Sequence, residues 1–359
     1  MKGKCLRPAI FISAAAAAAS FTLAGCIVSG PVSTGTESVS ETASGTFAFK
    51  KDPVTVNAFM LDTYISISAY QDVDEAVLKE TLKLCENYED MFSMQKEGSA
   101  LYNLNENVTD RVPAELGQVI SNSLEWSSRS EGGFQISIGR VSELWDFTSG
   151  SHKIPSDEDI AAALKTVDDA KIRAYPADKN DKGSEYIIEK PSDTKLDLGA
   201  VAKGYIADKL KEDLLSRGIT SAVINLGGNV LCVGDKNGEP FNIGIRKPFA
   251  GDTDMITVLA LKDCSAVSSG ISERFFEEND MIYHHILNPE TGYPYENDLL
   301  QTTVISKDSF TGDILSTLCY ALGPDKALEL CKNEADKELI LVDKDYRLIT
   351  SEGADKIIK

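Results

Sequence analysis

The sequence predicts an α+β protein with mixed, largely antiparallel sheets and flanking helices. Short runs rich in β-branched and aromatic residues occur along most of the chain, and they come in groups that helical patterns separate. A regular βαβ array would instead alternate one strand with one helix throughout. The chain has 359 residues and is 42% hydrophobic, which suffices for one large domain or two modest ones.

The first half of the chain combines one strand pair with three helices. Residues 54–70 are β-branched and aromatic with local alternation, which predicts paired strands. Apolar residues then recur near helical period over residues 72–92. A second helix is expected over residues 114–130, and a third from Ser156 to about residue 170. Between these two helices, "GGFQISIGRVSELW" predicts an alternating strand that ends at a core tryptophan.

The second half alternates short strands with two helices. Helices are expected near residues 201–217 and 311–334. Strands are expected near residues 185–190, 220–225, 229–233, 241–245, 256–261, 301–306, 338–342 and 346–350. In "INLGGNVLCVG", Gly227 and Gly228 predict a tight turn or a bulge between two of these strands.

The N-terminal segment predicts export. Basic residues precede an Ala-rich apolar run that is short for a membrane span. The run ends in "LAGC", which resembles the lipobox of bacterial lipoproteins, in which the cysteine, here Cys26, becomes the lipidated N-terminus. Residues 1–25 are therefore expected to be a lipoprotein signal peptide. The predicted location is the bacterial cell membrane, with the protein lipid-anchored and facing outside the cytoplasm.

Residues 26–50 are expected to form the lipidated Cys26 and a flexible tether, because Ser, Thr and Gly dominate them. Residues 51–359 form the predicted folded domain. Its five cysteines are scattered without C-x-x-C spacing, which favours buried free thiols over a metal or redox motif.

The net charge of −20 argues against nucleic acid and anionic membrane surfaces as partners. A ligand that carries phosphate would therefore need a local cation or a helix N-terminus to hold it. The segment "KLDLGAVAKGYIADKL" offers such a place, because a short strand with Asp197 passes through Gly199 into an amphipathic helix. Lys203 adds a positive charge there. An ordinary strand-to-helix turn with a surface lysine explains the same pattern.

Two oxygen-bearing side chains, Asp313 and Thr317, lie four residues apart at the start of the predicted helix 311–334. Residues at this spacing share one face of a helix. Mg²⁺ takes oxygen ligands and leaves coordination positions for substrate phosphate. A helix-capping Asp with a core-facing Thr is the alternative.

Two of the three histidines are adjacent, in "YHHILNPETGYP". If they end a strand, their side chains point to opposite faces, so at most one of them faces a ligand. Ser269, in "AVSSGISERFF", follows a predicted strand, but the G-x-S-x-G pattern of hydrolase nucleophiles is absent.

Eight segments, taken in order from about Val54 to Ser351, resemble the ApbE family of FAD:protein FMN transferases. They are "LDTYISI", "FSMQKEGSALYNLN", "GGFQISIGRVSELWDF", "DLGAVAKGYIADKL", "INLGGN", "AVSSG", "HHILNPETGYP" and "DILSTL". The resemblance implies an ApbE-like flavin transferase fold. It also implies Mg²⁺-dependent transfer of FMN from FAD to a threonine or serine hydroxyl of an exported or membrane redox protein, with release of AMP. The acceptor would carry a Ser/Thr-rich flavinylation segment.

The resemblance also implies roles for individual residues. Asp313 and Thr317, with the backbone carbonyl of Ala200, would hold Mg²⁺, and His285 would be the catalytic base or would orient the acceptor hydroxyl. An imidazole can accept a hydroxyl proton near neutral pH. The implied contacts to the flavin nucleotide are Met60, Leu61, Gly133, Phe134, Gln135, Asp197, Lys203 and Ile286.

Three positions depart from the family pattern. Gln135 stands where an Asp is usual, Gln95 stands about where an aromatic residue often stacks on the flavin, and Asn288 replaces the Asp before a proline. Asparagine keeps the turn-forming chemistry of that position.

Three other functions remain open from the sequence. An Mg²⁺-dependent FAD pyrophosphatase would use the same metal site with water as the acceptor. A non-catalytic flavin-binding lipoprotein would need the pocket but neither Asp313 nor His285. A solute-binding lipoprotein fits the tether but predicts two lobes with parallel sheets, which the β-rich pattern disfavours.

Overall fold

The computed structural model describes residues 47–150, 152–178, 180–251 and 253–359, all of which belong to one compact unit. The predicted signal peptide, Cys26 and nearly all of the predicted tether lie outside the described residues. Within the described residues, no helix is both long enough and apolar enough to span a membrane.

An eight-stranded sheet, in which every neighbouring pair is antiparallel, forms the centre of the unit. Its strands in spatial order are β1 Phe49–Met60, β2 Thr63–Gln71, β6 Ser221–Leu226, β7 Asn229–Gly234, β10 Ser265–Gly270, β13 Leu299–Ser306, β14 Glu338–Asp343 and β15 Leu348–Thr350. The middle strands are buried on both faces. In β13, for example, every residue but one is buried, and that one is partly exposed. The predicted antiparallel α+β class is confirmed.

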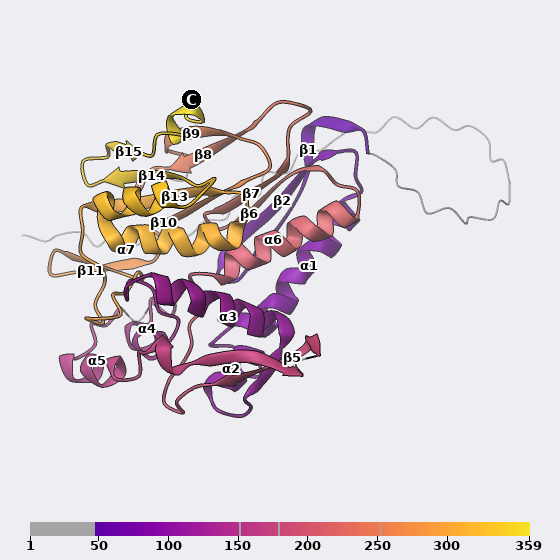
Figure 1. Cartoon of the computed structure of the whole chain (residues 1–359). Helices are drawn as coiled ribbons and strands as arrows, with labels where there is room; N and C mark the ends of the chain where they lie inside the picture. The colour runs from indigo at the N-terminus through magenta and orange to yellow at the C-terminus, as the bar shows by residue number, and fades with distance from the viewer. Residues whose placement is uncertain (1–46, 151, 179, 252) are drawn as a thin grey trace, which may run out of the picture. The chain divides into compact units, whose positions relative to one another are not determined.

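Three helices cover one face of this sheet, as Figure 1 shows. They are α1 Glu75–Phe92, α6 Ala202–Ser216 and α7 Ser309–Asn333. Helix α7 is two helices joined at a kink, because Gly323 has a φ of 74° and Pro324 follows it. The hairpin of β8 Phe241–Arg246 and β9 Met255–Leu261 packs on the opposite face of the sheet.

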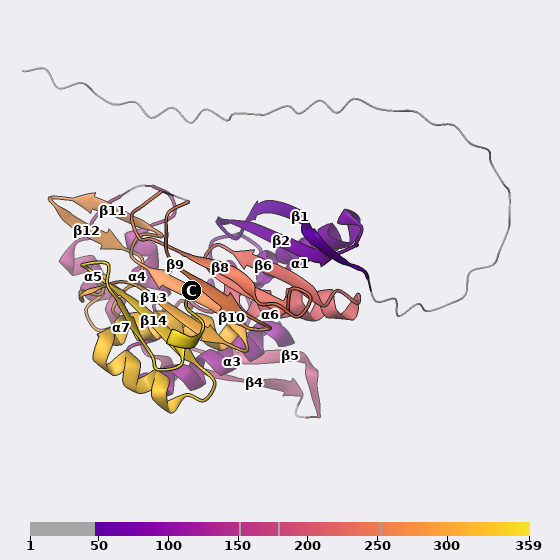
Figure 2. The same ribbon diagram turned by 90° about the horizontal axis from the view of Figure 1, so that it is seen from above.

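A smaller layer lies beyond the helices (Figures 1 and 2). It has a three-stranded antiparallel sheet in the order β3-β5-β4, against which helix α3 packs. Its elements are α2 Ala100–Asn105, β3 Arg111–Pro113, α3 Ala114–Arg129, α4 Gly139–Trp145, α5 Asp157–Leu164, β4 Arg173–Asp178 and β5 Asp181–Glu189.

A separate hairpin, of β11 Phe275–Glu278 and β12 Met281–His284, lies beside α4 and α5 in both views. Its Phe276 and Tyr283 stack on each other, and Tyr283 also stacks on the buried Trp145 of α4. Trp145 donates its indole N–H to the Gly292 carbonyl at 2.7 Å. The prediction of a core tryptophan is therefore confirmed, and this aromatic packing fixes the base of the hairpin.

The alternating strand predicted before Trp145 is wrong. Phe134 and Ile136 are buried, as alternation requires, but the N–H groups of Ile136 and Ser137 donate to the Asp169 carboxylate instead of a neighbouring strand. Helix α4 then begins at Gly139. The alternation of apolar residues predicted which side chains are buried, but it does not indicate which groups bond to the backbone N–H groups.

The third predicted helix, from Ser156 to about residue 170, is too long. Ser156 caps α5 as expected, but α5 ends at Leu164. The Thr166 hydroxyl donates to the Ala163 carbonyl, and Asp168 caps a short 3-10 helix, Asp169–Lys171. Such side-chain bonds to nearby backbone compete with helix continuation.

Candidate functional site

The site is built around the N-terminus of helix α6. A buried extended segment brings Asp197 to Gly199, whose N–H donates to the Asp197 carboxylate at 2.8 Å. Ala200 and Val201 follow, and α6 begins at Ala202 without a side-chain cap from Val201. The Ala202 N–H donates to the Leu198 carbonyl at 2.9 Å, whereas the Gly204 N–H in the first turn takes a partner from elsewhere in the chain.

That partner is Asp313 of α7, whose Oδ2 accepts a hydrogen bond from the Gly204 N–H at 2.7 Å. Only glycine permits this approach, because a Cβ on Gly204 would lie 2.4 Å from the Ser309 carbonyl oxygen. Asp313 is 4% exposed. Burial raises the pKa of Asp313 to about 7, while Lys203 and the Gly204 N–H act in the opposite direction.

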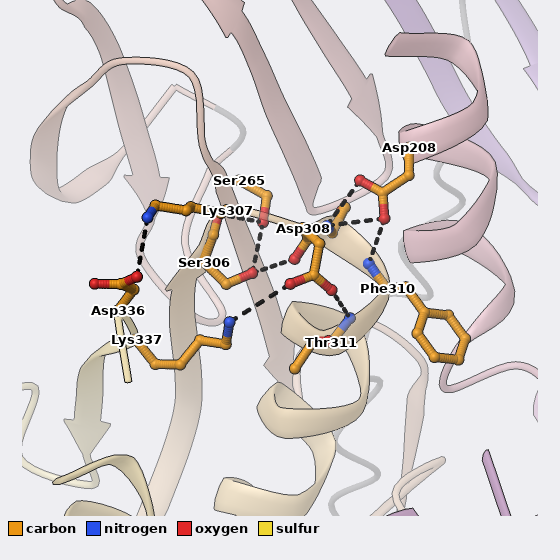
Figure 3. Close-up of polar contacts among 10 residues, drawn as sticks. Asp208, Ser265, Ser306, Lys307, Asp308, Phe310, Thr311, Asp336 and Lys337 are labelled. Atoms are coloured by element: carbon orange, nitrogen blue, oxygen red, sulfur yellow. Dashed lines mark hydrogen bonds and ion pairs between the residues drawn. The ribbon is translucent and has the colours of Figure 1, made fainter. Parts of the chain in front are cut away.

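The start of α7 is held in turn by α6. Asp208 accepts hydrogen bonds from the backbone N–H groups of Ser309 and Phe310 at 2.8–3.0 Å, as Figure 3 shows. Asp308 caps α7 itself by accepting from the Thr311 N–H at 2.8 Å. Burial raises the pKa of Asp208 to about 6, against the effect of the N–H groups. Each helix thus supplies a carboxylate to the N-terminus of the other, which fixes Asp313 relative to Lys203.

Thr317 lies one turn after Asp313 on α7. Its hydroxyl is 3.3 Å from that of Ser269 in β10, and the Ser269 hydroxyl is 2.7 Å from that of Ser316. Ser269 is the second-to-last residue of strand β10, whereas the prediction from the sequence was that it follows the strand. Its hydroxyl serves to join β10 to α7.

The predicted metal ligands supply oxygen atoms of the kind that Mg²⁺ prefers: one carboxylate, one hydroxyl and one backbone carbonyl. The buried Asp313 carboxylate, whose charge burial disfavours, fits a bound cation. Within the described parts of the chain, His, Cys, Asp and Glu side chains form no cluster of three or more that could hold a metal. A cation here would accordingly keep several positions for water or substrate oxygens.

His285 follows strand β12 and lies opposite the residues that precede β11. Its Nδ1 is 3.3 Å from the Arg274 carbonyl oxygen, and its Nε2 is 4.0 Å from Oε2 of Glu273. Desolvation, together with the positive charges of Arg274 and Lys203, lowers the pKa of His285 to about 3. Burial raises the pKa of Glu273, against Lys203 and Arg274.

Glu273 is the residue of this group that the sequence did not single out. It stands in "AVSSGISERFF", four residues after Ser269. Its position became visible only with the pairing of β11 and β12, which brings residues 273–274 beside His285.

His284 has a different environment from its neighbour. Its ring is 4% exposed and meets the Tyr320 ring edge-on. Nδ1 accepts from the Ile286 N–H at 3.3 Å, so Nε2 is the protonated nitrogen and donates to the Tyr295 carbonyl at 3.0 Å. Burial lowers the pKa of His284 to about 4. His284 therefore packs in the core, while His285 faces the charged groups.

Three predicted flavin contacts, Gly133, Phe134 and Ile286, are linked through Tyr295. Gly133 accepts a hydrogen bond from the Tyr295 hydroxyl at 3.2 Å, and the Tyr295 N–H donates to the Ile286 carbonyl. Phe134 is buried next to Gly133. A Cβ on Gly133 would be 3.2 Å from Leu318, the residue after Thr317, so this group adjoins the predicted metal ligands.

Gln135 is directed away from these groups and toward Asp169. Its amide oxygen accepts a hydrogen bond from the Asp169 N–H at 3.1 Å. Gln95, the second departure, is exposed and donates to the Thr148 hydroxyl at 3.2 Å. Asn288 accepts from the Glu290 N–H at 2.8 Å, which is the turn-forming bond expected of it.

Met60 and Leu61 lie at the turn between β1 and β2, where Leu61 has a φ of 54° and donates its N–H to Glu89. No direct contact joins them to Asp313 or His285 in the described residues, but the Gly227–Gly228 turn lies between Thr63, next to this turn, and Glu273. A Cβ on Gly227 would lie 2.0 Å from Oγ1 of Thr63, and one on Gly228 would lie 3.6 Å from Glu273. Both glycines have positive φ between β6 and β7, which confirms the predicted tight turn.

A cavity of about 560 Å³ lies at the other end of β10, where Cys264 precedes the strand. Lysines line it, but Lys211 pairs with Asp263 and Lys307 pairs with Asp336. None of the residues predicted for the flavin or metal site lines this cavity. The predicted residues Asp313 and Lys203 lie instead where the N-terminus of α6 meets α7.

The fold and this site define a class of protein: an α+β domain that presents a carboxylate, a lysine and a histidine at the N-terminus of one helix. The ApbE family profile matches residues 61–341, and the chain belongs to the ApbE family. It is 32% identical over 299 residues to the FAD:protein FMN transferase of Klebsiella pneumoniae, covering 82% of this chain and 90% of that one. It is 29% identical to the FAD:protein FMN transferase of Treponema pallidum, covering 77% and 80% of the two chains.

Solved structures agree with this assignment. The crystal structure of the ApbE protein from Thermotoga maritima is similar with a TM-score of 0.75 and 29% identity, covering 85% of this chain and 99% of that one. The flavin transferase ApbE from Vibrio cholerae shares the fold, with a TM-score of 0.73 at 21% identity and the same coverage.

Proposed function

We propose that the chain is an FAD:protein FMN transferase that uses Mg²⁺ and passes FMN to a threonine or serine hydroxyl of an acceptor protein, with release of AMP. The observation that carries this proposal is the buried Asp313 carboxylate at the N-terminus of α6, with Lys203 beside it and His285 opposite. The names of the relatives in Klebsiella pneumoniae and Treponema pallidum support the same activity.

Breaking a pyrophosphate requires that negative charge be neutralised and that the attacking oxygen be aligned. Asp313, Thr317 and the Ala200 carbonyl would hold Mg²⁺, which when bound neutralises charge on the phosphate oxygens. Lys203 supplies a second positive charge. The N-terminus of α6 adds its own partial positive charge, which favours phosphate.

His285 is suited to receive the proton of the acceptor hydroxyl. Its Nδ1 faces the Arg274 carbonyl, so the ring is neutral with the proton on Nδ1 and a lone pair on Nε2. The neighbouring positive charges keep it in the neutral form, which is the form that can accept a proton. Gly133 is linked through Tyr295 to Ile286, the residue after His285, and Gly133, Phe134 and Ile286 would contact the flavin nucleotide.

The acceptor is expected to be a membrane redox protein on the outer face of the membrane, with a Ser/Thr-rich segment. The enzyme would reach it from its own lipid anchor at Cys26. Radioactive fatty acid added to cells that express the chain should label the wild-type protein and not a Cys26→Ser variant. Equal labelling of the two would remove the anchor from the proposal.

The test of the activity is an incubation of the purified protein with FAD, Mg²⁺ and a candidate acceptor domain. The proposal predicts AMP and an FMN-sized increase in the acceptor mass, both of which EDTA abolishes and excess Mg²⁺ restores. AMP without the mass increase would instead support an FAD pyrophosphatase. If FAD is bound and recovered unchanged, the chain is a flavin-binding protein and not a transferase.

A further inference from the structure

We propose that Glu273 stabilises His285 in its protonated form during transfer and thereby completes the base that activates the acceptor hydroxyl. This role rests on the proposed function and assigns a residue beyond the predicted set. The proposal follows from which ring nitrogen of His285 each neighbouring group approaches.

The two ring nitrogens of His285 have different partners. Nδ1 lies 3.3 Å from the Arg274 carbonyl oxygen, which can only accept, so Nδ1 carries the proton. Nε2 carries the lone pair and faces Oε2 of Glu273 at 4.0 Å. The carboxylate is therefore on the reacting side of the ring, not behind it as in a Ser-His-Asp triad.

The spacing between Nε2 and the carboxylate leaves the Nε2 lone pair available. At 4.0 Å the two atoms are beyond hydrogen-bond distance, so a hydroxyl group can approach Nε2. The side chains of both residues are partly exposed, 28% for His285 and 30% for Glu273, so the acceptor can enter from solvent. An acceptor hydroxyl placed there can donate its proton to Nε2.

A protonated His285 needs a compensating negative charge. The charged and titratable groups that act on it are Arg274, Lys203 and His284, and all three disfavour its protonation. Within the described residues, Glu273 is the carboxylate within ion-pair distance of the ring. Its attraction to the imidazolium exists only after proton transfer, so it favours the transition state over the ground state.

The step balances as follows. The O–H bond of the acceptor breaks as its proton passes to Nε2, and the oxygen forms a P–O bond to the phosphorus of the FMN half of FAD. The P–O bond to the AMP phosphate breaks, and AMP leaves with that electron pair. The proton on Nε2, held by Glu273, then passes to solvent.

The backbone fixes this pair without help from a ligand. The Glu273 N–H donates to the Gly270 carbonyl at 3.3 Å, and the His285 N–H donates to the Arg274 carbonyl at 3.1 Å. Glu273 precedes β11 and His285 follows β12, so both lie at the open end of the β11–β12 hairpin, whose register sets their separation.

The test is a double-mutant cycle of Glu273→Gln and His285→Ala, with Glu277→Gln, an exposed acid on the same hairpin, as the matched control. Glu273→Gln should lower kcat for FMN transfer by about 10- to 100-fold, with FAD affinity and thermal midpoint near wild type. Adding Glu273→Gln to His285→Ala should cause no further loss, because the carboxylate acts only through the ring. Glu277→Gln should be unchanged.

Full transfer by Glu273→Gln, or losses that multiply in the double variant, would overturn the role of Glu273 while leaving the proposed function intact. A loss of FAD binding equal to the loss of kcat would assign Glu273 to the nucleotide instead. If the wild-type protein forms neither adduct nor AMP, the proposed function itself fails, and the role of Glu273 fails with it.

Discussion

The Asp313 carboxylate of α7 accepts a hydrogen bond from the Gly204 N–H of α6 at 2.7 Å, across 109 positions of sequence. The same carboxylate is the predicted cation ligand, so it has a structural and a chemical role at once. A substitution can distinguish the two roles, because an amide can replace a carboxylate as a hydrogen-bond acceptor but carries no negative charge.

Asp313→Asn is therefore expected to fold and to lose activity. The amide oxygen still accepts from Gly204, and a charge that burial disfavours is removed, so the thermal midpoint should not fall. FMN transfer should decrease at least ~100-fold because the cation loses its carboxylate. Asp308→Asn is the control, since asparagine caps α7 as well as aspartate does and the Asp308 carboxylate bonds to Thr311 and Lys337 and not to the predicted ligands. Retained Mg²⁺-dependent turnover in Asp313→Asn would contradict the metal assignment.

Asp208 should make the stability depend on pH. Its pKa is raised from 3.8 to about 6, so the native state binds more protons than the unfolded state between these values. The stabilising contribution is full below about pH 4 and is lost as the pH rises through 6, by roughly 2–3 kcal/mol. Urea unfolding should show that Asp208→Asn removes this slope and leaves the one from Asp313, whose pKa lies higher. Identical pH profiles for wild type and variant would contradict it.

The adjacent histidines should differ in what they contribute. His284→Ala removes a buried ring and its hydrogen bond to the Tyr295 carbonyl, so it should lower the free energy of unfolding by roughly 2–4 kcal/mol. His285→Ala should change stability by less and should lower the transfer rate at least ~100-fold, to a measurable residual rate, while FAD still binds. Denaturant unfolding and FAD fluorescence measure the two effects. Loss of FAD binding in His285→Ala would remove the base assignment.

Gln135→Asp, which restores the residue usual in the family, should not raise activity. Gln135 accepts from the Asp169 N–H, and the shorter aspartate would bring a second carboxylate close to the buried Asp169. We expect a loss of about 1–2 kcal/mol in stability, with Gln135→Glu, which keeps the side-chain length, less affected. A gain in transfer rate by Gln135→Asp would show that position 135 contacts the nucleotide.

The elements that the sequence predicted well are those whose signals are local. The Gly227–Gly228 turn needs positive φ at both positions, and glycine supplies it. Helix α6 follows from apolar periodicity, and the cap of α5 at Ser156 follows standard chemistry.

The contacts that the sequence did not predict are those made by pairing distant segments. Asp169 captures the N–H groups of Ile136 and Ser137, which turned a predicted strand into an irregular segment. Glu273 reaches His285 only because β11 and β12 pair, and neither short strand has a periodicity that reveals its partner. Lys203 and Asp313, named from the resemblance, lie where the N-terminus of α6 meets α7, yet no periodicity would have joined Asp313 to Gly204.

The most direct measurement is the intact mass of an acceptor domain after incubation with FAD, Mg²⁺ and either the wild-type chain or Asp313→Asn. We expect the wild-type reaction to add one FMN to the acceptor, with the increase lost when the acceptor threonine is replaced by alanine and absent with Asp313→Asn. An acceptor of unchanged mass alongside wild-type AMP release, or an equal mass increase with Asp313→Asn, would contradict transfer through this site.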